Sequence, residues 1–85
     1  MEIIYIPKAK EHLDYWISTG NKTLLKKIAQ LTQSIIENPF AGIGKPEALK
    51  HELTGYWSRR INQEHRFVHA VIDNTLIVQS LKGHY

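Results

Sequence analysis

The stretch GYWSRRINQEHRFVHAVIDNTLIVQSL, residues 55–81, indicates the fold most directly. It contains three runs rich in β-branched and aromatic residues, at Tyr56–Ile61, His65–Ile72 and Thr75–Leu81. Runs of this composition favour β-strands. The polar residues 62–64 separate the first two runs, and Asp73-Asn74 between the last two is a favourable two-residue hairpin turn. This part of the chain therefore predicts an antiparallel meander.

The residues before this stretch predict one further strand and two helices. Met1–Ile6 is a short apolar run that ends at Pro7, as a strand would. Apolar residues then recur at helical spacing over Lys8–Thr19 and over about Lys22–Glu37. The second helix carries its apolar residues on one face and most of its lysines on the other. The two helices therefore form a hairpin whose apolar face needs a covering sheet.

Local signals mark the ends of both helices. Gly20 is suited to close the first helix and Asn21 to cap the second. The second helix ends at Asn38, because a residue that precedes proline is pushed out of the α region. Pro39–Pro46 is a loop, and Glu47–Thr54 is ambiguous, with one helical turn as one interpretation. The expected order is β-α-α-β-β-β, an α+β fold with an antiparallel sheet and the helix pair on one face.

Composition excludes several classes of protein. The chain has 85 residues, 42% of them hydrophobic, no cysteine and a formal net charge of +3. This length predicts a single domain over residues 1–85. Without cysteine there is no disulfide scaffold, no cysteine-ligated zinc site and no thiol nucleophile. No apolar run is long enough to span a bilayer, and no secretory signal precedes the first strand, so the expected location is the cytoplasm with no membrane partner.

The ionisable residues concentrate in the second half of the chain. Cations and histidines alternate with acids between residues 45 and 69: Lys45, Lys50, Arg59, Arg60, Arg66, His51, His65, His69, Glu47, Glu52 and Glu64. Adjacent strand residues point to opposite faces, so only one of Arg59 and Arg60 shares a surface with Arg66. An arginine fork suits a phosphate, although a solvated strand surface or an ion pair with Glu52 or Glu64 is the more common explanation of such residues.

The histidines do not predict a metal site. His65 and His69 are four residues apart, which suits a metal pair on a helix, but a strand would separate their Cβ atoms by about 13 Å at its rise of about 3.3 Å per residue. His69 is better explained as a partly buried histidine. His84, one residue from the C-terminus, is either part of a site or in a solvated tail.

The motifs of this half resemble a known family. KPEALKHELTGYWSRRINQEHRFVHAV, residues 45–71, together with the terminal His84-Tyr85, closely resembles the YoeB toxins of the Txe/YoeB family in the RelE-like superfamily. The resemblance extends over essentially the whole chain. It implies the fold of small microbial ribonucleases and a toxin of a bacterial type II toxin–antitoxin pair, which cleaves mRNA in the ribosomal A site.

The resemblance also implies roles for individual residues. Glu47, Arg66, His84 and Tyr85 fall on the catalytic positions of the family, and Lys50, Arg60, Arg59 and Glu64 fall among the RNA-binding and supporting positions. Two departures stand out. The family often has an aromatic residue where this chain has Gly83, which would loosen the tail, and often has tyrosine in place of His69.

The implied chemistry uses the 2′-OH of RNA as the nucleophile. Glu47 would act as the base, Arg66 with Lys50 or Arg60 would stabilise the charged phosphate, His84 would act as the acid, and Tyr85 would orient His84 or stack on a base. No metal and no cofactor is required. The implied partners are an antitoxin similar to YefM, the ribosome with its mRNA, a second copy of the chain, and operator DNA through the antitoxin complex.

Two other functions remain open from the sequence. ParE-like toxins share the fold and inhibit DNA gyrase without a catalytic set, and a ribosome-binding module whose chemistry has decayed would also fit. A net charge of +3 is too small to hold free RNA strongly, so an active enzyme would depend on the ribosome for its substrate.

Overall fold

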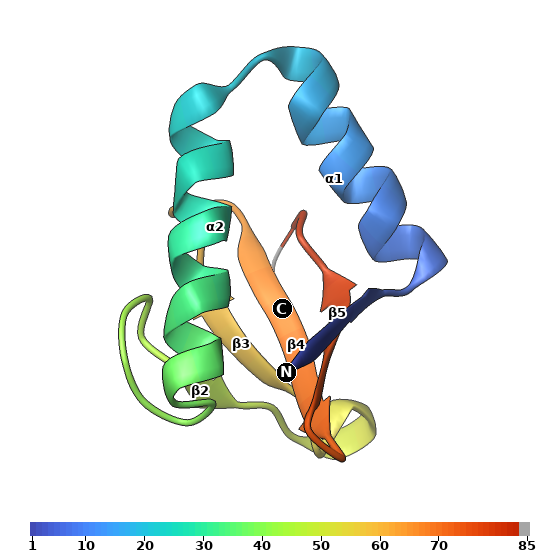
Figure 1. The fold of residues 1–85 in the computed structure, drawn as a ribbon, viewed down its shortest axis with the longest axis vertical. Coiled ribbons are helices and arrows are strands. Elements are labelled where there is room, and N and C mark those ends of the chain that lie inside the picture. Colours follow the sequence, from blue (N-terminus) through green and yellow to red (C-terminus); the bar gives the residue numbers. More distant parts are fainter. Residues whose placement is uncertain (84–85) are drawn as a thin grey trace.

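The computed structural model describes residues 1–83 and contains two helices and five strands (Figure 1). In chain order these are β1 (Glu2–Tyr5), α1 (Pro7–Thr19), α2 (Lys22–Glu37), β2 (Glu47–Ala48), a 3₁₀ turn (His51–Leu53), β3 (Trp57–Arg60), β4 (Arg66–Ile72) and β5 (Thr75–Ser80). The strands form one sheet in the order β1-β5-β4-β3-β2. The predicted α+β class is confirmed. Among the described residues, no helix is long and apolar enough to cross a membrane.

The sheet differs from the predicted antiparallel sheet in two ways. β1 pairs with β5 in parallel, so the sheet is mixed, and the ambiguous segment after Pro46 supplies a fifth strand, β2, which pairs with β3. Short turns impose antiparallel pairing only on strands that are neighbours in the chain. β1 and β5 lie at opposite ends of the sequence, so no turn constrains their relative direction. β2 has only two residues, too few to give a periodic pattern.

The ends of the helices and the last hairpin follow the local signals. Gly20 adopts a left-handed conformation with φ of 70°, and the Asn21 side chain accepts a hydrogen bond from the backbone of Leu24 at 3.1 Å. At the hairpin, Asp73 and Asn74 have positive φ angles of 49° and 59°, as a type I′ turn requires.

Both helices cover the same face of the sheet (Figure 1). The core beneath them consists of α1, α2 and sheet residues: Ala9, Trp16, Leu24, Ile28, Leu31, Ile35, Ile61, Phe67, Leu76, Val78 and Leu81. Burial of this apolar surface is the main source of stability in a domain of this size. The helix-covered face of the sheet is thus part of the core. The opposite face of β2, β3 and β4 is covered by neither α1 nor α2 and is available for a functional site.

Strand alternation assigns the residues of β3 and β4 to these two faces. Arg59 pairs with Phe67 and points to the helices, because Phe67 belongs to the core. Ser58 and Arg60 have the opposite parity and therefore lie on the open face. Arg60 pairs with Arg66, which brings both arginines to that face.

Candidate active site

A hollow of about 160 Å³ lies on the open face of the sheet, and it is lined by Lys45, Glu47, Leu49, Ser58, Arg60 and Arg66. Three neighbouring strands supply the key side chains. Glu47 begins β2 and pairs with Ser58 of β3, while Arg60 at the end of β3 pairs with Arg66 at the start of β4. The register of the sheet therefore brings together residues that are up to 19 positions apart in the chain.

The hollow has a distinctive balance of charge. Glu47 is the one acid among its lining residues, against the three cations Lys45, Arg60 and Arg66. A surface with excess positive charge suits an anion such as a phosphodiester, and guanidinium groups match phosphate oxygens well. The carboxylate is the group in this hollow that can take up a proton. The arrangement can therefore bind a phosphate and move a proton beside it.

Arg66 is oriented by the turn that precedes β4. Its Nη1 donates to the carbonyl oxygens of Asn62 at 2.8 Å, His65 at 3.2 Å and Gln63 at 3.3 Å. The turn is itself closed by the Asn62 side chain, which accepts from the backbone N–H groups of Glu64 and His65. One nitrogen of the guanidinium is thus fixed on the backbone, which limits how the rest of the fork can point.

The structure contradicts the expectation that Arg59 contacts RNA. Its side chain is completely buried on the helix-covered face. Nη1 donates to Ser34 Oγ at 2.7 Å and to the Ile43 carbonyl at 3.1 Å, and Nη2 donates to the carbonyls of Asn38 and Ala41 at 2.7 and 3.0 Å. Burial lowers the pKa of Arg59 from its ordinary value. Arg59 and Arg60 are adjacent in β3, so their side chains point to opposite faces of the sheet. Arg59 therefore binds the loop after α2, whereas Arg60 lines the hollow.

This loop in turn positions Lys45 and Glu47. The carbonyl of Gly44 accepts a hydrogen bond of 2.7 Å from the backbone of Arg60, which joins the loop to the end of β3. Gly44 has a positive φ of 83°, and an added Cβ would lie 2.6 Å from Leu31 Cδ2. A glycine is therefore required where the loop passes between α2 and β3.

Two of the supporting residues implied by the resemblance lie outside the hollow. Lys50 is exposed immediately before the 3₁₀ turn, and Glu64 is exposed in the turn before β4. Neither lines the hollow. Their contact with RNA stays a prediction. His84 and Tyr85 lie outside the described residues.

Sequence reasoning did not include Lys45, Leu49 and Ser58 among its site residues. Ser58 shares its parity with Arg60, so alternation along β3 could have indicated it once the open face was known. Lys45 and Leu49 lie in irregular segments, where no periodicity exists. Their positions depend on the loop that Arg59 holds.

A second hollow of about 360 Å³ adjoins the first. It shares Lys45 and Arg60 with the first hollow and adds Lys27, Gly44, Ile61, Asn62 and Gln63. Positive charge therefore continues from the open face of the sheet toward α2. A nucleic-acid strand placed in the first hollow would meet one further cation, Lys27, along this direction.

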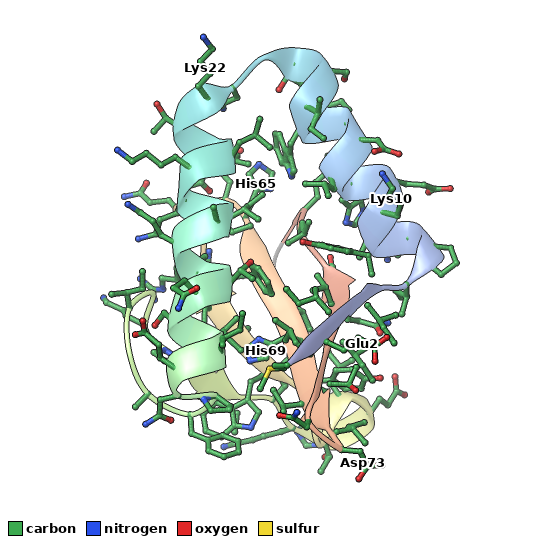
Figure 2. All side chains as sticks on the ribbon, in the orientation of Figure 1. Glu2, Lys10, Lys22, His65, His69 and Asp73 are labelled. Atoms are coloured by element: carbon green, nitrogen blue, oxygen red, sulfur yellow. The ribbon has the colours of Figure 1, made fainter. Side chains whose placement is uncertain are left out.

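His69 is almost fully buried beneath α2, deeper than the partial burial expected from the sequence (Figure 2). Within residues 1–83, neither of its ring nitrogens has a partner in hydrogen-bond geometry. Burial and the nearby charge of Arg59 lower its pKa to about 4, and the carbonyls of Pro39 and Phe67 offset this only in part. No group of three or more histidine and acidic side chains in the described part of the chain is arranged to hold a metal ion.

Comparison with known proteins agrees with this geometry. The family model for the YoeB-like toxin of bacterial type II toxin–antitoxin systems matches residues 5–85. Toxin YoeB of Synechocystis sp. is 52% identical over 73 residues, 85% of each chain. Toxin YoeB of Escherichia coli K12 is 44% identical over 85 residues, the full length of both chains.

Solved structures of a Staphylococcus aureus relative have the same fold. A heterotetrameric YoeB–YefM toxin–antitoxin complex matches with a TM-score of 0.90, and a YoeB dimer matches with 0.91. Both are 48% identical in sequence, and the match covers 100% of this chain and 98% of theirs. With this agreement in sequence, length and fold, the chain belongs to the YoeB-like toxins of bacterial type II toxin–antitoxin systems.

Proposed function

We propose that this toxin is a ribosome-dependent endoribonuclease that cleaves mRNA in the ribosomal A site and thereby stops translation. The observation that carries the proposal is the hollow in which Glu47 lies among Lys45, Arg60 and Arg66. Cleavage of RNA needs a base, cations around the phosphate and an acid for the leaving group. The hollow contains the first two kinds of group.

In the proposed reaction Glu47 takes the proton of the ribose 2′-OH, and O2′ attacks the neighbouring phosphorus. As the O2′–P bond forms, negative charge grows on the phosphate oxygens, where Arg66 and Arg60 stabilise it. The P–O5′ bond then breaks, and His84 donates a proton to the leaving oxygen. The products are a 2′,3′-cyclic phosphate and a 5′-OH end. Imidazole suits the acid role because its ordinary pKa of about 6.5 is close to working pH.

Gly83 supports the inclusion of His84 in this scheme. The carbonyl of Gly83 accepts a hydrogen bond of 2.8 Å from the backbone of Arg66, which lines the hollow. The residue that precedes His84 in the chain is therefore attached to the same strand end that presents Arg66. We propose that Tyr85 orients His84 or stacks on a base of the mRNA.

Dependence on the ribosome follows from the modest charge. With a net charge of +3, the chain can neutralise few phosphates, so its affinity for free RNA at physiological salt is expected to be low. The ribosome would supply both the binding surface and the geometry of the mRNA. Because a S. aureus relative has been solved with YefM and as a dimer, we further propose a YefM-like antitoxin and a second copy of this chain as partners.

The test is primer extension on a defined mRNA in a purified translation system, with and without ribosomes. We expect the wild type to cut at the A-site codon only when ribosomes are present. Glu47→Ala and His84→Ala should each slow the cut by roughly 10²–10⁴-fold, the usual contribution of a general base or acid. Glu52→Ala is the matched control, since Glu52 is an exposed acid outside the hollow.

Other outcomes would replace the proposal. Translation that stops without any cut would indicate a binding-only inhibitor. No effect on translation would instead call for a gyrase supercoiling assay, because the ParE-like alternative acts there. Equal cutting of free and ribosome-bound mRNA would contradict the proposed dependence on the ribosome.

A further inference from the structure

Three aromatic rings hold the backbone that follows β5. β5 ends at Ser80, so the polar backbone groups of Leu81 and Gly83 lie beyond the last regular pairing of the sheet. Ring nitrogens of His12, Trp16 and His65 form hydrogen bonds with these backbone groups instead of a neighbouring strand. We call these three residues the ring clamp.

The α1 side of the ring clamp binds Leu81. His12 and Trp16 are four positions apart and therefore project from the same side of the helix. His12 Nδ1 accepts from the backbone N–H of Leu81 at 3.1 Å, and Trp16 Nε1 donates to the Leu81 carbonyl at 2.9 Å. Both backbone groups of one residue are thus bound by side chains of α1, and Trp16 is itself buried in the core.

The β4 side of the ring clamp binds Gly83. Gly83 donates its N–H to His65 Nδ1 at 2.9 Å, and its carbonyl accepts from the backbone of Arg66 at 2.8 Å. In Figure 2, His65 lies between the two helices. Its ring packs edge-on against Trp16 with centroids 4.7 Å apart, so the two sides of the ring clamp contact each other.

The hydrogen bonds assign a chemical state to both histidines. An imidazole nitrogen that accepts from a backbone N–H carries no proton, so both rings bind through an unprotonated Nδ1. Burial, together with the positive charges of Lys8 and Lys82, lowers the pKa of His12 and favours its neutral form. Lys82 lies between the two bound residues, and its Nζ is 4.1 Å from the ring centroid of Tyr15 on α1.

We propose that His12, Trp16 and His65 are positioning residues for the cleavage reaction: they fix Leu81 and Gly83 and thereby determine where the chain end with His84 and Tyr85 begins. This inference rests on the proposed role of His84 as the acid. A misplacement of about 1 Å in a reacting group can cost about 10²-fold in rate. The carbonyl of Gly83 accepts a hydrogen bond from the backbone N–H of Arg66, so a displacement of Gly83 would change the distance between the proposed acid and the hollow.

The test compares His65→Phe with His65→Asn. Phenylalanine retains a ring beside Trp16 but has no acceptor, whereas the asparagine Oδ1 can accept near the place of Nδ1. We expect His65→Phe to lower the single-turnover cleavage rate on preformed ribosome–mRNA complexes by roughly 10–100-fold with little change in the half-saturating toxin concentration. His65→Asn should retain most of the wild-type cleavage rate.

Amide hydrogen exchange provides a readout that does not depend on cleavage. The Gly83 amide should be protected in the wild type and in His65→Asn, and should exchange faster in His65→Phe. His51→Asn is the control, because His51 is an exposed histidine and asparagine tolerates its positive φ of 59°. Thermal unfolding of each variant shows whether the fold is retained. If His65→Phe does not fold, His12→Leu against His12→Asn tests the same idea at Leu81.

The outcomes separate this inference from the proposed function. Faster Gly83 exchange with an unchanged cleavage rate would overturn the positioning role. A slow His65→Asn that nevertheless protects Gly83 would also overturn it, because the hydrogen bond would then be insufficient. If the wild type itself does not cut ribosome-bound mRNA, the proposed function fails, and the positioning role of the ring clamp fails with it. Unchanged Gly83 exchange in His65→Phe would overturn the ring clamp alone.

Discussion

Arg59 and His69 are two basic side chains in the core, and within residues 1–83 neither forms an ion pair. Arg59 is stabilised by oxygen atoms instead. Its partners include the carbonyl of Asn38, which caps the C-terminal end of α2, where the helix dipole favours a positive charge. His69 has no comparable set of acceptors, so it is stable in the core only while it is neutral.

His69 should make the stability of the protein depend on pH. Its pKa is about 4 in the folded chain, against the ordinary 6.5 expected after unfolding. As the pH falls from 6.5 toward 4, the unfolded chain takes up a proton that the folded chain does not, so the free energy of unfolding decreases. The loss should be complete below pH 4 and reach about 3 kcal/mol, at about 1.36 kcal/mol per pKa unit.

The measurement is urea unfolding of the wild type and of His69→Phe between pH 7.5 and pH 4. Carboxylates titrate in both proteins, so the informative quantity is the difference between the two curves. We expect that difference to change by about 3 kcal/mol in favour of the variant as the pH falls. Parallel curves would contradict a buried neutral His69.

At the scale of elements, the loop between α2 and β2 connects the core to the site. Arg59 binds three of its carbonyls from within, and Gly44 passes between Leu31 of α2 and the backbone of Arg60. The open end of this loop carries Lys45 and leads into Glu47. The position of the site therefore depends on close packing in the loop.

Gly44→Ala and Gly55→Ala separate crowding from backbone strain. Both glycines have positive φ angles, of 83° and 98°, but an added Cβ has no atom within 4 Å at Gly55 and has three contacts of 3.2 Å or less at Gly44. Left-handed strain of about 1–2 kcal/mol should affect both variants. Overpacking should cost Gly44→Ala roughly 1–3 kcal/mol more.

Urea unfolding measures this difference, and cleavage of ribosome-bound mRNA measures its effect on the site. We expect Gly44→Ala to be the less stable variant and to cleave more slowly, because Lys45 and Glu47 would shift with the loop. Equal losses of stability in the two variants would show that the loop adjusts to a methyl group without strain.

At the scale of the whole molecule, the distribution of charge should decide how the protein meets nucleic acid. The two adjoining hollows place Lys45, Arg60 and Arg66 together, and Lys27 extends this group toward α2. Lys22, in contrast, lies at the far end of α2, next to the turn between the helices (Figure 2). A strand that follows the hollows would contact the first group and not Lys22.

The dependence of binding on salt tests this placement. If Lys27, Lys45, Arg60 and Arg66 each neutralise one phosphate of single-stranded RNA, log K should fall against log salt with a slope of about −3, at about 0.7 per phosphate. Arg60→Ala should reduce the magnitude of the slope by about 0.7, and the matched control Lys22→Ala should leave it unchanged. Fluorescence anisotropy with a labelled oligonucleotide gives the slopes. The same slope for all three proteins would place the RNA elsewhere.

The sequence alone determined the features that depend on near neighbours in the chain. Gly20, Asn21 and Pro39 set the ends of the helices, and Asp73-Asn74 set the last hairpin, because each acts on the backbone within a few residues. The motif between Lys45 and Val71, together with the terminal His84-Tyr85, predicted the YoeB-like family, and this prediction is confirmed. The role of His84 stays a prediction.

Only the tertiary structure decided which faces and edges meet. Three features depend on contacts between residues far apart in the chain: the parallel pairing of β1 with β5, the burial of Arg59, and the position of Glu47 and Arg66 in one hollow. The ring clamp is the extreme case, since Trp16 and Leu81 are separated by 65 positions. Propensity and periodicity act over a few residues, whereas such contacts form only when two helices and a sheet bury a common core.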